Sequence, residues 1–127
     1  MLNDSKTFSS FSIDDLDRAK EFYGGVLQLP VRDTPEGLSL ETPGGGRTFL
    51  YRKPNHEPAT FTVLNFQVGD VEGTVAELKK RGVKFEHYDM PGIKTDEQGI
   101  ARGKGPTIAW FKDPAGNILS VLSDPRA

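Results

Sequence analysis

A repeated segment is the feature of this sequence that most restricts the folds open to it. The stretch FSIDDLD, residues 11–17, returns 55 positions later as FQVGDVE, residues 66–72. Aromatic, aliphatic and acidic residues fall at matching positions in the two stretches. A second similarity links RTFLYRK, residues 47–53, with TIAWFKD, residues 107–113. Two similarities in the same order predict a duplicated module of about 55 to 60 residues.

Each half follows the same order of elements. A strand at 7–13 or 61–68 leads through aspartate into a helix whose apolar residues recur at helical spacing. Asp14 and Asp70 are the expected helix N-caps, because a short side-chain oxygen can accept a free backbone N–H. Several short strands follow each helix. We expect them near 30–33, 37–42 and 46–52, and then near 83–88, 99–103, 106–112 and 117–123.

Glycine-rich sequence marks the ends of these elements. Gly24-Gly25 and Gly82 are expected to end the two helices. The sequence PGGGR, residues 43–47, lacks the helix and the lysine of a phosphate-binding loop, so it predicts a hairpin turn. The sequence DPAG, residues 113–116, has the residues of a tight turn. Residues 89–106 show no convincing period and are expected to be a mobile rim loop or a poorly regular strand without chemistry of its own, with a functional rim as the alternative.

The composition excludes several classes of function. Of 127 residues, 35% are hydrophobic and 27% charged, the formal net charge is −2, and cysteine is absent. Lysine and arginine are scattered, so no nucleic-acid partner is expected. We find neither a signal pattern nor a long apolar run, and we therefore expect no membrane partner and a cytoplasmic protein. Without cysteine, disulfides and thiolate metal sites are excluded.

Three segments resemble the vicinal oxygen chelate superfamily, the glyoxalase/bleomycin-resistance/dioxygenase group. They are FSIDDLDRAKEFYGGVLQLPV (11–31), FQVGDVEGTVAELKKRGVKFE (66–86) and AWFKDPAGNILSV (109–121). The resemblance implies an α+β fold in which two βαβββ modules form an open-sided mixed-sheet barrel. It implies one domain over 1–127, with half-modules at about 6–54 and 60–124. It also implies a homodimer.

The resemblance implies three metal-ligand positions, and each holds a residue that binds metal poorly. Metal-dependent relatives carry a histidine where this chain has Phe8, a second ligand at the position of Val63, and a glutamate at the position of Ser120. A metal ligand must offer a lone pair, which Phe and Val lack, and a serine hydroxyl alone is a weak ligand. We therefore expect no metal and no other cofactor at this site.

Strand alternation extends the candidate site beyond these three positions. If they face a cavity, as the resemblance implies, residues two positions away on each strand face it too. Trp110, the only tryptophan, occupies a position that often lines the pocket in relatives. Apolar residues mixed with amides and hydroxyls are typical of a small-molecule site, and the alternative is a closed core with satisfied polar groups. The expected ligand-binding residues are Phe8, Ser10, Ser12, Val63, Asn65, Gln67, Trp110, Ile118, Ser120 and Leu122.

The chain has two histidines as candidate catalytic bases. His56 lies in KPNHEPA and is expected to be an exposed loop residue between the halves. His87 would share a strand face with Val83 and Phe85, where a histidine is more typical of a structural role. If His87 faces the cavity, it is the best general base available. Asp14, Asp15 and Asp17 are explained by helix-start chemistry.

These observations favour one function and leave two others open. The favoured function is metal-independent binding of a small, partly aromatic molecule, an antibiotic or a metabolite that the protein sequesters, as in the antibiotic-binding branch of the superfamily. The alternative is a lyase, isomerase or dioxygenase-like enzyme with a rebuilt or metal-free site that uses His87 or a carboxylate as base. A third class is an interaction or regulatory module with a vestigial cleft. The sequence does not identify the ligand.

Overall fold

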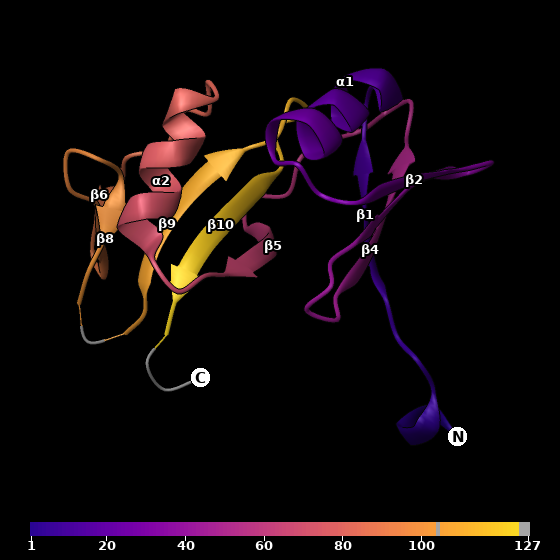
Figure 1. Ribbon diagram of the computed structural model, residues 1–127, viewed down its shortest axis with the longest axis horizontal. Helices are drawn as coiled ribbons and strands as arrows, with labels where there is room; N and C mark the ends of the chain where they lie inside the picture. Colours follow the sequence, from indigo (N-terminus) through magenta and orange to yellow (C-terminus); the bar gives the residue numbers. More distant parts are fainter. Residues whose placement is uncertain (104, 125–127) are drawn as a thin grey trace. The chain divides into compact units, whose positions relative to one another are not determined.

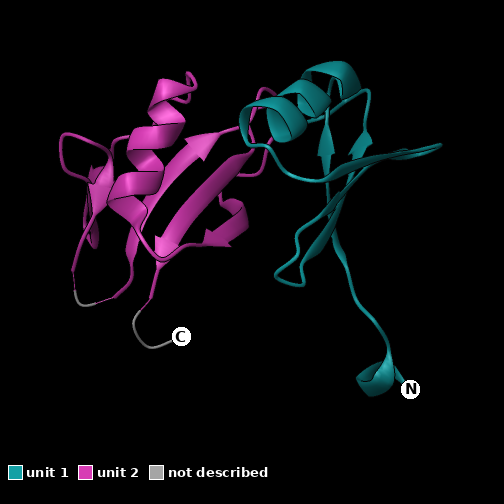
Figure 2. Ribbon diagram, in the orientation of Figure 1, with its two compact units in different colours: residues 1–57 teal, residues 58–127 magenta. Residues whose placement is uncertain are grey.

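The computed structural model describes residues 1–103 and 105–124, and the chain divides into two compact units. Figure 2 distinguishes unit 1, residues 1–57, from unit 2, residues 58–127. Within the described residues each unit holds one four-stranded mixed sheet with helix on one face, and neither sheet closes on itself. The predicted α+β fold with two βαβββ modules is confirmed. No helix in this part of the chain is long and apolar enough to cross a membrane.

Unit 1 contains the first βαβββ module after a short N-terminal 3-10 helix. Its sheet has the order β1-β4-β3-β2, in which β1 runs parallel to β4 and the other neighbours are antiparallel. Parallel pairing requires a long crossover, which the helix and two strands between β1 and β4 supply. The elements are η1 (Leu2–Asp4), β1 (Ser9–Ile13), α1 (Leu16–Lys20), η2 (Glu21–Val26), β2 (Val31–Thr34), β3 (Gly37–Glu41) and β4 (Arg47–Arg52).

The core of unit 1 lies on the helix-covered face of its sheet, where Ile13, Tyr23 and Leu50 are fully buried. The helix begins one residue later than expected, because the side chain of Asp15, not Asp14, accepts the N-terminal N–H of Arg18 at 3.1 Å. The prediction that Gly24-Gly25 ends the helix is also wrong. Both glycines lie inside the π-helical turn η2, which continues to Val26.

Unit 2 repeats this plan with one insertion. Its sheet has the order β5-β10-β9-β8, with β5 parallel to β10, and a separate hairpin of β6 and β7 is inserted after the helix. Figure 1 shows α2 lying along β9 and β10. The elements are β5 (Thr62–Gln67), α2 (Val71–Lys80), β6 (Asp89–Met90), β7 (Ile93–Lys94), β8 (Ile100–Ala101), β9 (Thr107–Lys112) and β10 (Ile118–Ser123).

Local signals in unit 2 have the predicted consequences. The carboxylate of Asp70 accepts the backbone N–H of Gly73 at 3.0 Å and caps α2 as expected. Gly82 has φ +93° just after the helix, a conformation that glycine adopts without strain. The turn at 113–116 is also confirmed: Asp113 Oδ1 accepts the backbone N–H groups of Ala115 and Asn117, each at 2.9 Å.

Two longer-range expectations are wrong. By position in the sheet β4 corresponds to β10 and β3 to β9, so the second sequence similarity paired non-equivalent strands. Residues 83–88 form no strand, and only Phe85 makes an isolated bridge, with Phe111 of β9. The segment 89–106 holds only short regular pieces, the β6–β7 hairpin and β8, and β8 falls within the strand expected near 99–103.

Candidate functional site

The sheet of unit 2 presents one face to α2 and leaves the other without a helix. On the helix-covered face Leu119 and Phe111 are directly paired, and both are fully buried. The next pair, Ser120 and Trp110, points to the opposite face because successive strand residues alternate. Asn65 of β5 pairs with Ser120 on the other side. A row of three residues, Asn65, Ser120 and Trp110, therefore crosses the helix-free face.

Ser120 is the buried centre of this row. Its side chain is 0% exposed, and its hydroxyl donates a hydrogen bond to Asn65 Oδ1 at 2.5 Å. Asn65 itself is exposed. A buried hydroxyl without a partner would be costly, and the exposed amide supplies that partner.

Trp110 forms the wall of a hollow on this face. The indole is half-buried, and its Nε1 donates to Thr62 Oγ1 at 3.2 Å. The ring of Tyr88 meets it edge-on, with centroids 5.3 Å apart and planes at 82°. Burial raises the pKa of the Tyr88 phenol, and the nearby charge of Glu86 raises it further. The phenol is therefore neutral at physiological pH and offers a flat ring and a hydroxyl.

The β6–β7 hairpin forms the second side of the hollow. Its base is fixed by Thr95, whose Oγ1 accepts the backbone N–H of Tyr88 at 2.9 Å and whose own N–H donates to Tyr88 O at 2.9 Å. Met90 and Ile93 pair across the hairpin, so their side chains share one face of it. Met90 is 49% exposed. An apolar side chain this exposed is available for contact with a ligand.

Two adjoining cavities in unit 2 border the indole. We call the smaller one, of about 290 Å³, the aromatic compartment, and the larger one, of about 490 Å³, the aliphatic compartment. The aromatic compartment is lined by Thr60, Phe61, Thr62, Tyr88, Met90, Ile93, Trp110 and Ile118. The aliphatic compartment is lined by Met90, Gly92, Ile93, Lys94, Ala101, Arg102, Gly103, Gly105, Pro106, Ile108 and Trp110.

An ion-pair network holds the rim of the aliphatic compartment. Arg102 binds Asp96 and also Glu72 of α2, the latter at 2.9 Å. The pKa of Asp96 lies below its usual range, first because the backbone N–H of Ile100 bonds its carboxylate and then because Arg102 does. The same carboxylates raise the pKa of Arg102. The guanidinium is thus occupied by protein carboxylates.

Not all of the predicted ligand-binding residues line these cavities. Of the ten, Trp110 and Ile118 do so, while Asn65 and Ser120 lie in the same row as the indole. Gln67 and Leu122 pair one step further along β5 and β10. Val63 falls at the register irregularity opposite Ile118 and Leu119, where strand alternation is interrupted.

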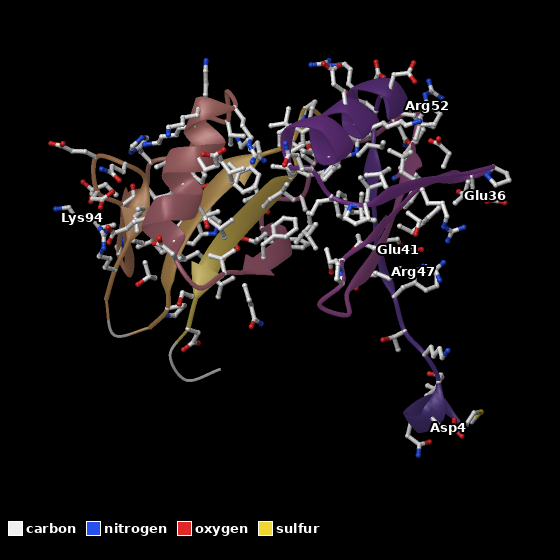
Figure 3. All side chains as sticks on the ribbon, in the orientation of Figure 1. Asp4, Glu36, Glu41, Arg47, Arg52 and Lys94 are labelled. Carbon is white, nitrogen blue, oxygen red and sulfur yellow. The ribbon has the colours of Figure 1, made fainter. Side chains whose placement is uncertain are left out.

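The remaining three predicted residues belong to unit 1. Ser10 pairs with Phe49 and Ser12 with Tyr51, on the helix-free face of that sheet. Phe8 is 57% exposed and precedes β1, and the Arg47 guanidinium lies 5.0 Å from its ring centroid. Figure 3 labels Arg47 beside Glu41, its partner across the β3–β4 pair.

Both histidines differ from expectation. His56 is half-buried rather than freely exposed, and its Nδ1 lies 2.6 Å from Ser12 Oγ in a hydrogen bond. His87 is exposed in an irregular segment, not on an apolar strand face with Val83 and Phe85. It lines neither compartment. The geometry therefore gives His87 no support as a catalytic base in this hollow.

Sequence reasoning missed four of the residues that make the hollow: Phe61, Tyr88, Met90 and Ile93. Three of them lie in or beside the β6–β7 hairpin, within or next to the segment expected to be loop. The available signal was Pro91-Gly92 between two apolar residues, which is typical of a tight turn between strands.

Comparison with models of known protein families identifies one family. The model of the Glyoxalase/Bleomycin resistance protein/Dioxygenase superfamily matches residues 10–121. No curated protein sequence matches the chain.

Several solved structures share the fold at low identity. TnmS3, an antibiotic binding protein from Streptomyces sp. CB03234, is 21% identical, with a TM-score of 0.68 over 95% of this chain and 98% of that one. A glyoxalase family protein from Enterococcus faecalis is 18% identical, with a TM-score of 0.69 over 96% and 99%. A glyoxalase/dioxygenase from Nostoc punctiforme is 18% identical, with a TM-score of 0.65 over 94% and 91%.

Proposed function

This chain belongs to the glyoxalase/bleomycin resistance protein/dioxygenase superfamily, and we propose that it is a metal-independent binding protein for a small planar aromatic molecule. One observation carries the proposal: the half-buried indole of Trp110 is a wall of both cavities on the helix-free face of unit 2. An indole offers a flat stacking surface, and aromatic pairs gain about 0.5–1.5 kcal/mol beyond their buried area.

The chemistry of the hollow supports binding rather than catalysis. Among the described residues that line the two compartments, none is Asp, Glu or His. A general base must reach the proton that it removes, and the raised pKa of Tyr88 makes its phenol a poor source of such a base. The alternative of a lyase, isomerase or dioxygenase-like enzyme that uses His87 or a carboxylate therefore lacks that group within the hollow. The cavity sizes fall near the usual range for small-molecule sites, roughly 300–1,000 Å³.

The donor set supports the metal-independent part of the proposal. Of the three positions that correspond to metal ligands in relatives, Ser120 is buried with its hydroxyl bonded to Asn65, and Phe8 and Val63 have no donor atom. In the part of the chain that the structure describes, no group of three or more His, Asp or Glu side chains could hold an ion. These residues do not fit a divalent cation.

Sequestration of the ligand is the physiological role that we propose for this binding. Support comes from the shared fold of TnmS3, which is described as an antibiotic binding protein. Simple sequestration needs only affinity, which a hollow of aromatic and aliphatic walls can supply. The expected homodimer and the cytoplasmic location stay predictions.

Native mass spectrometry against a library of aromatic metabolites and antibiotics tests the proposal. We expect at least one compound to bind with one molecule per hollow and to be released chemically unchanged. The bound compound should also quench the fluorescence of the only tryptophan. Trp110→Ala should abolish that binding. Elemental analysis of protein purified without chelator should find well under one equivalent of Zn, Ni, Mn or Fe. A released product of altered mass, or stoichiometric metal, would contradict the proposal.

A further inference from the structure

We infer that the ligand has two parts: an aromatic ring system in the aromatic compartment, joined to a non-aromatic, oxygen-bearing group that extends past Met90 into the aliphatic compartment. The inference rests on the proposed function and specifies the class of ligand. It follows from how the two compartments adjoin and from how their walls differ.

The compartments adjoin along three side chains. Met90, Ile93 and Trp110 line both cavities. Two of the three come from the β6–β7 hairpin, which forms its own two-stranded sheet and meets β8 of the main sheet through a bridge between Thr95 and Ala101. Methionine is unbranched and flexible, and this one is 49% exposed, so it can move aside at little cost. Met90 is therefore an adjustable divider between two parts of one hollow.

The walls of the two compartments suit different chemistry. The smaller compartment is bordered by the rings of Phe61, Tyr88 and Trp110, which favour an aromatic occupant. Away from the shared indole, the larger compartment has aliphatic side chains, such as Ala101 and Ile108, together with several glycines.

Glycine has no side chain to cover its peptide group, so a ligand can approach the backbone closely and exchange hydrogen bonds with it. Gly92, at φ +86° in the hairpin turn, is one such position. Two cationic residues line this compartment, and since Arg102 is already paired with Asp96 and Glu72, it is the ammonium group of Lys94 that can donate to a ligand oxygen. Hydroxyl, carbonyl or carboxylate oxygens fit these surroundings.

The volumes point to the same class of ligand. The aliphatic compartment, at about 490 Å³, is larger than the aromatic compartment, at about 290 Å³. A ligand that is only a ring system would leave the larger part of the hollow to solvent. A ligand with a second group attached to the ring would bury its apolar parts against Ala101 and Ile108 and gain affinity.

Calorimetric titration with two matched probes tests this inference. The probes are 2-naphthol, a ring system alone, and 2-naphthyl β-glucoside, the same ring joined to an oxygen-rich group. We expect the glucoside to bind the wild-type protein at least about tenfold more tightly, equivalent to about 1.4 kcal/mol. Ala101 pairs with Ile108 and lies on the cavity face, so Ala101→Phe fills the aliphatic compartment. It should reduce glucoside affinity to that of naphthol and leave naphthol binding unchanged.

Three further variants complete the experiment. Ile118→Phe narrows the aromatic compartment and should weaken both probes. Ala76→Phe makes the same chemical change as Ala101→Phe on the exposed side of α2 and should change neither probe. If Ala101→Phe still binds naphthol, the variant is folded. If far-UV circular dichroism instead shows that Ala101→Phe has lost structure, Ala101→Leu, which adds less volume, takes its place in the experiment.

The outcomes separate this inference from the proposed function. Equal affinity for the two probes in the wild-type protein, or equal weakening of both by the Ala101 variants, would overturn the two-part ligand while leaving aromatic binding intact. Failure of both probes to bind would remove the proposed function, and the two-part ligand with it.

Discussion

Ser120 and Asn65 are joined across the β10–β5 pair by a hydrogen bond in which the serine hydroxyl donates to Asn65 Oδ1 at 2.5 Å. On the same face, Ile118 and Leu122 are half-buried while Ser120 is fully buried. A small hydroxyl therefore lies between two aliphatic residues on β10 and opposite Trp110 of β9, and the asparagine amide accepts its hydrogen bond. This contact explains why a polar residue interrupts an otherwise apolar strand face.

A double-mutant cycle should reveal the energy of this contact. We expect Ser120→Ala to lower the free energy of unfolding by about 1 kcal/mol, and Asn65→Ala to lower it by about 1–3 kcal/mol because it leaves a buried hydroxyl without a partner. The double variant should cost less than the two together. Urea denaturation measures all three, with Ser123→Ala on the same strand as the control, expected within about 0.5 kcal/mol of wild type. Strict additivity would contradict a direct contact.

The parts of the fold that the sequence predicts are those decided locally. The first repeat places a strand, an aspartate and a helix within a few residues, and Asp70 caps α2 as its spacing indicates. The turn at 113–116 likewise depends on contacts between near neighbours. The second repeat failed because short strands of alternating apolar residues look alike, and only pairing with β1 or β5 decides which strand is which.

The candidate site was predicted less completely for the same reason. Trp110 could be singled out, because it is the only tryptophan and its position often lines the pocket in the family that the chain resembles. Met90 and Ile93 lie on two-residue strands, which are too short to show a period, and their hairpin depends on hydrogen bonds of Thr95. Ser12 and His56 are 44 residues apart in the sequence, and no local pattern predicts their contact.

Trp110 and its neighbour Phe111 offer a matched test of which face of β9 is the site. Trp110→Ala should abolish ligand binding and cost less stability than a core truncation, because the indole is only half-buried and borders open space. Phe111→Ala removes a ring that is 0% exposed on the helix-covered face and should cost about 3–5 kcal/mol. Chemical denaturation measures both free energies of unfolding.

Fluorescence of the single tryptophan gives an independent reading of the same geometry. The emission of wild-type protein should lie to the red of a fully buried indole, and acrylamide should quench it. Ligand titration should change it. Blue emission without acrylamide access would identify Trp110 as a core residue and remove the main wall of the hollow.

The phenol of Tyr88 should ionise in an alkaline transition that can be followed separately. Burial raises its pKa above the ordinary value of 10.0, so the folded state holds the phenolic proton more tightly than the unfolded state. The contribution of this shift to the free energy of unfolding is fully present when the pH is below the pKa of Tyr88 in the unfolded state. It is lost as the pH rises through the pKa of Tyr88 in the folded state. Absorbance titration at alkaline pH should show a transition that Tyr88→Phe removes and that the exposed-residue control Tyr51→Phe leaves in place. A Tyr88 transition at or below the ordinary value would contradict its burial against Trp110.

Asp96 should shape the acid side of the stability profile. Its folded pKa lies below the ordinary 3.8, first because of the backbone N–H of Ile100 and then because of Arg102. This stabilisation is fully present when the pH is above the pKa of Asp96 in the unfolded state. It is lost as the pH falls through the pKa of Asp96 in the folded state. Asp96→Asn should therefore flatten the acid limb of the stability profile, and an unchanged acid limb would contradict the role of this carboxylate.

Arg102→Gln tests which partner of Asp96 dominates. Because the backbone N–H of Ile100 is the first cause, the pKa of the Asp96 carboxyl should stay below its ordinary value in this variant, which NMR titration of the side-chain carboxyl carbon measures. Raising the salt concentration should act in the same way, since it screens the exposed ion pair more than the backbone hydrogen bond. A return of the Asp96 pKa to its ordinary range in Arg102→Gln would mean that the ion pair, and not the turn at 96–100, fixes the rim of the aliphatic compartment.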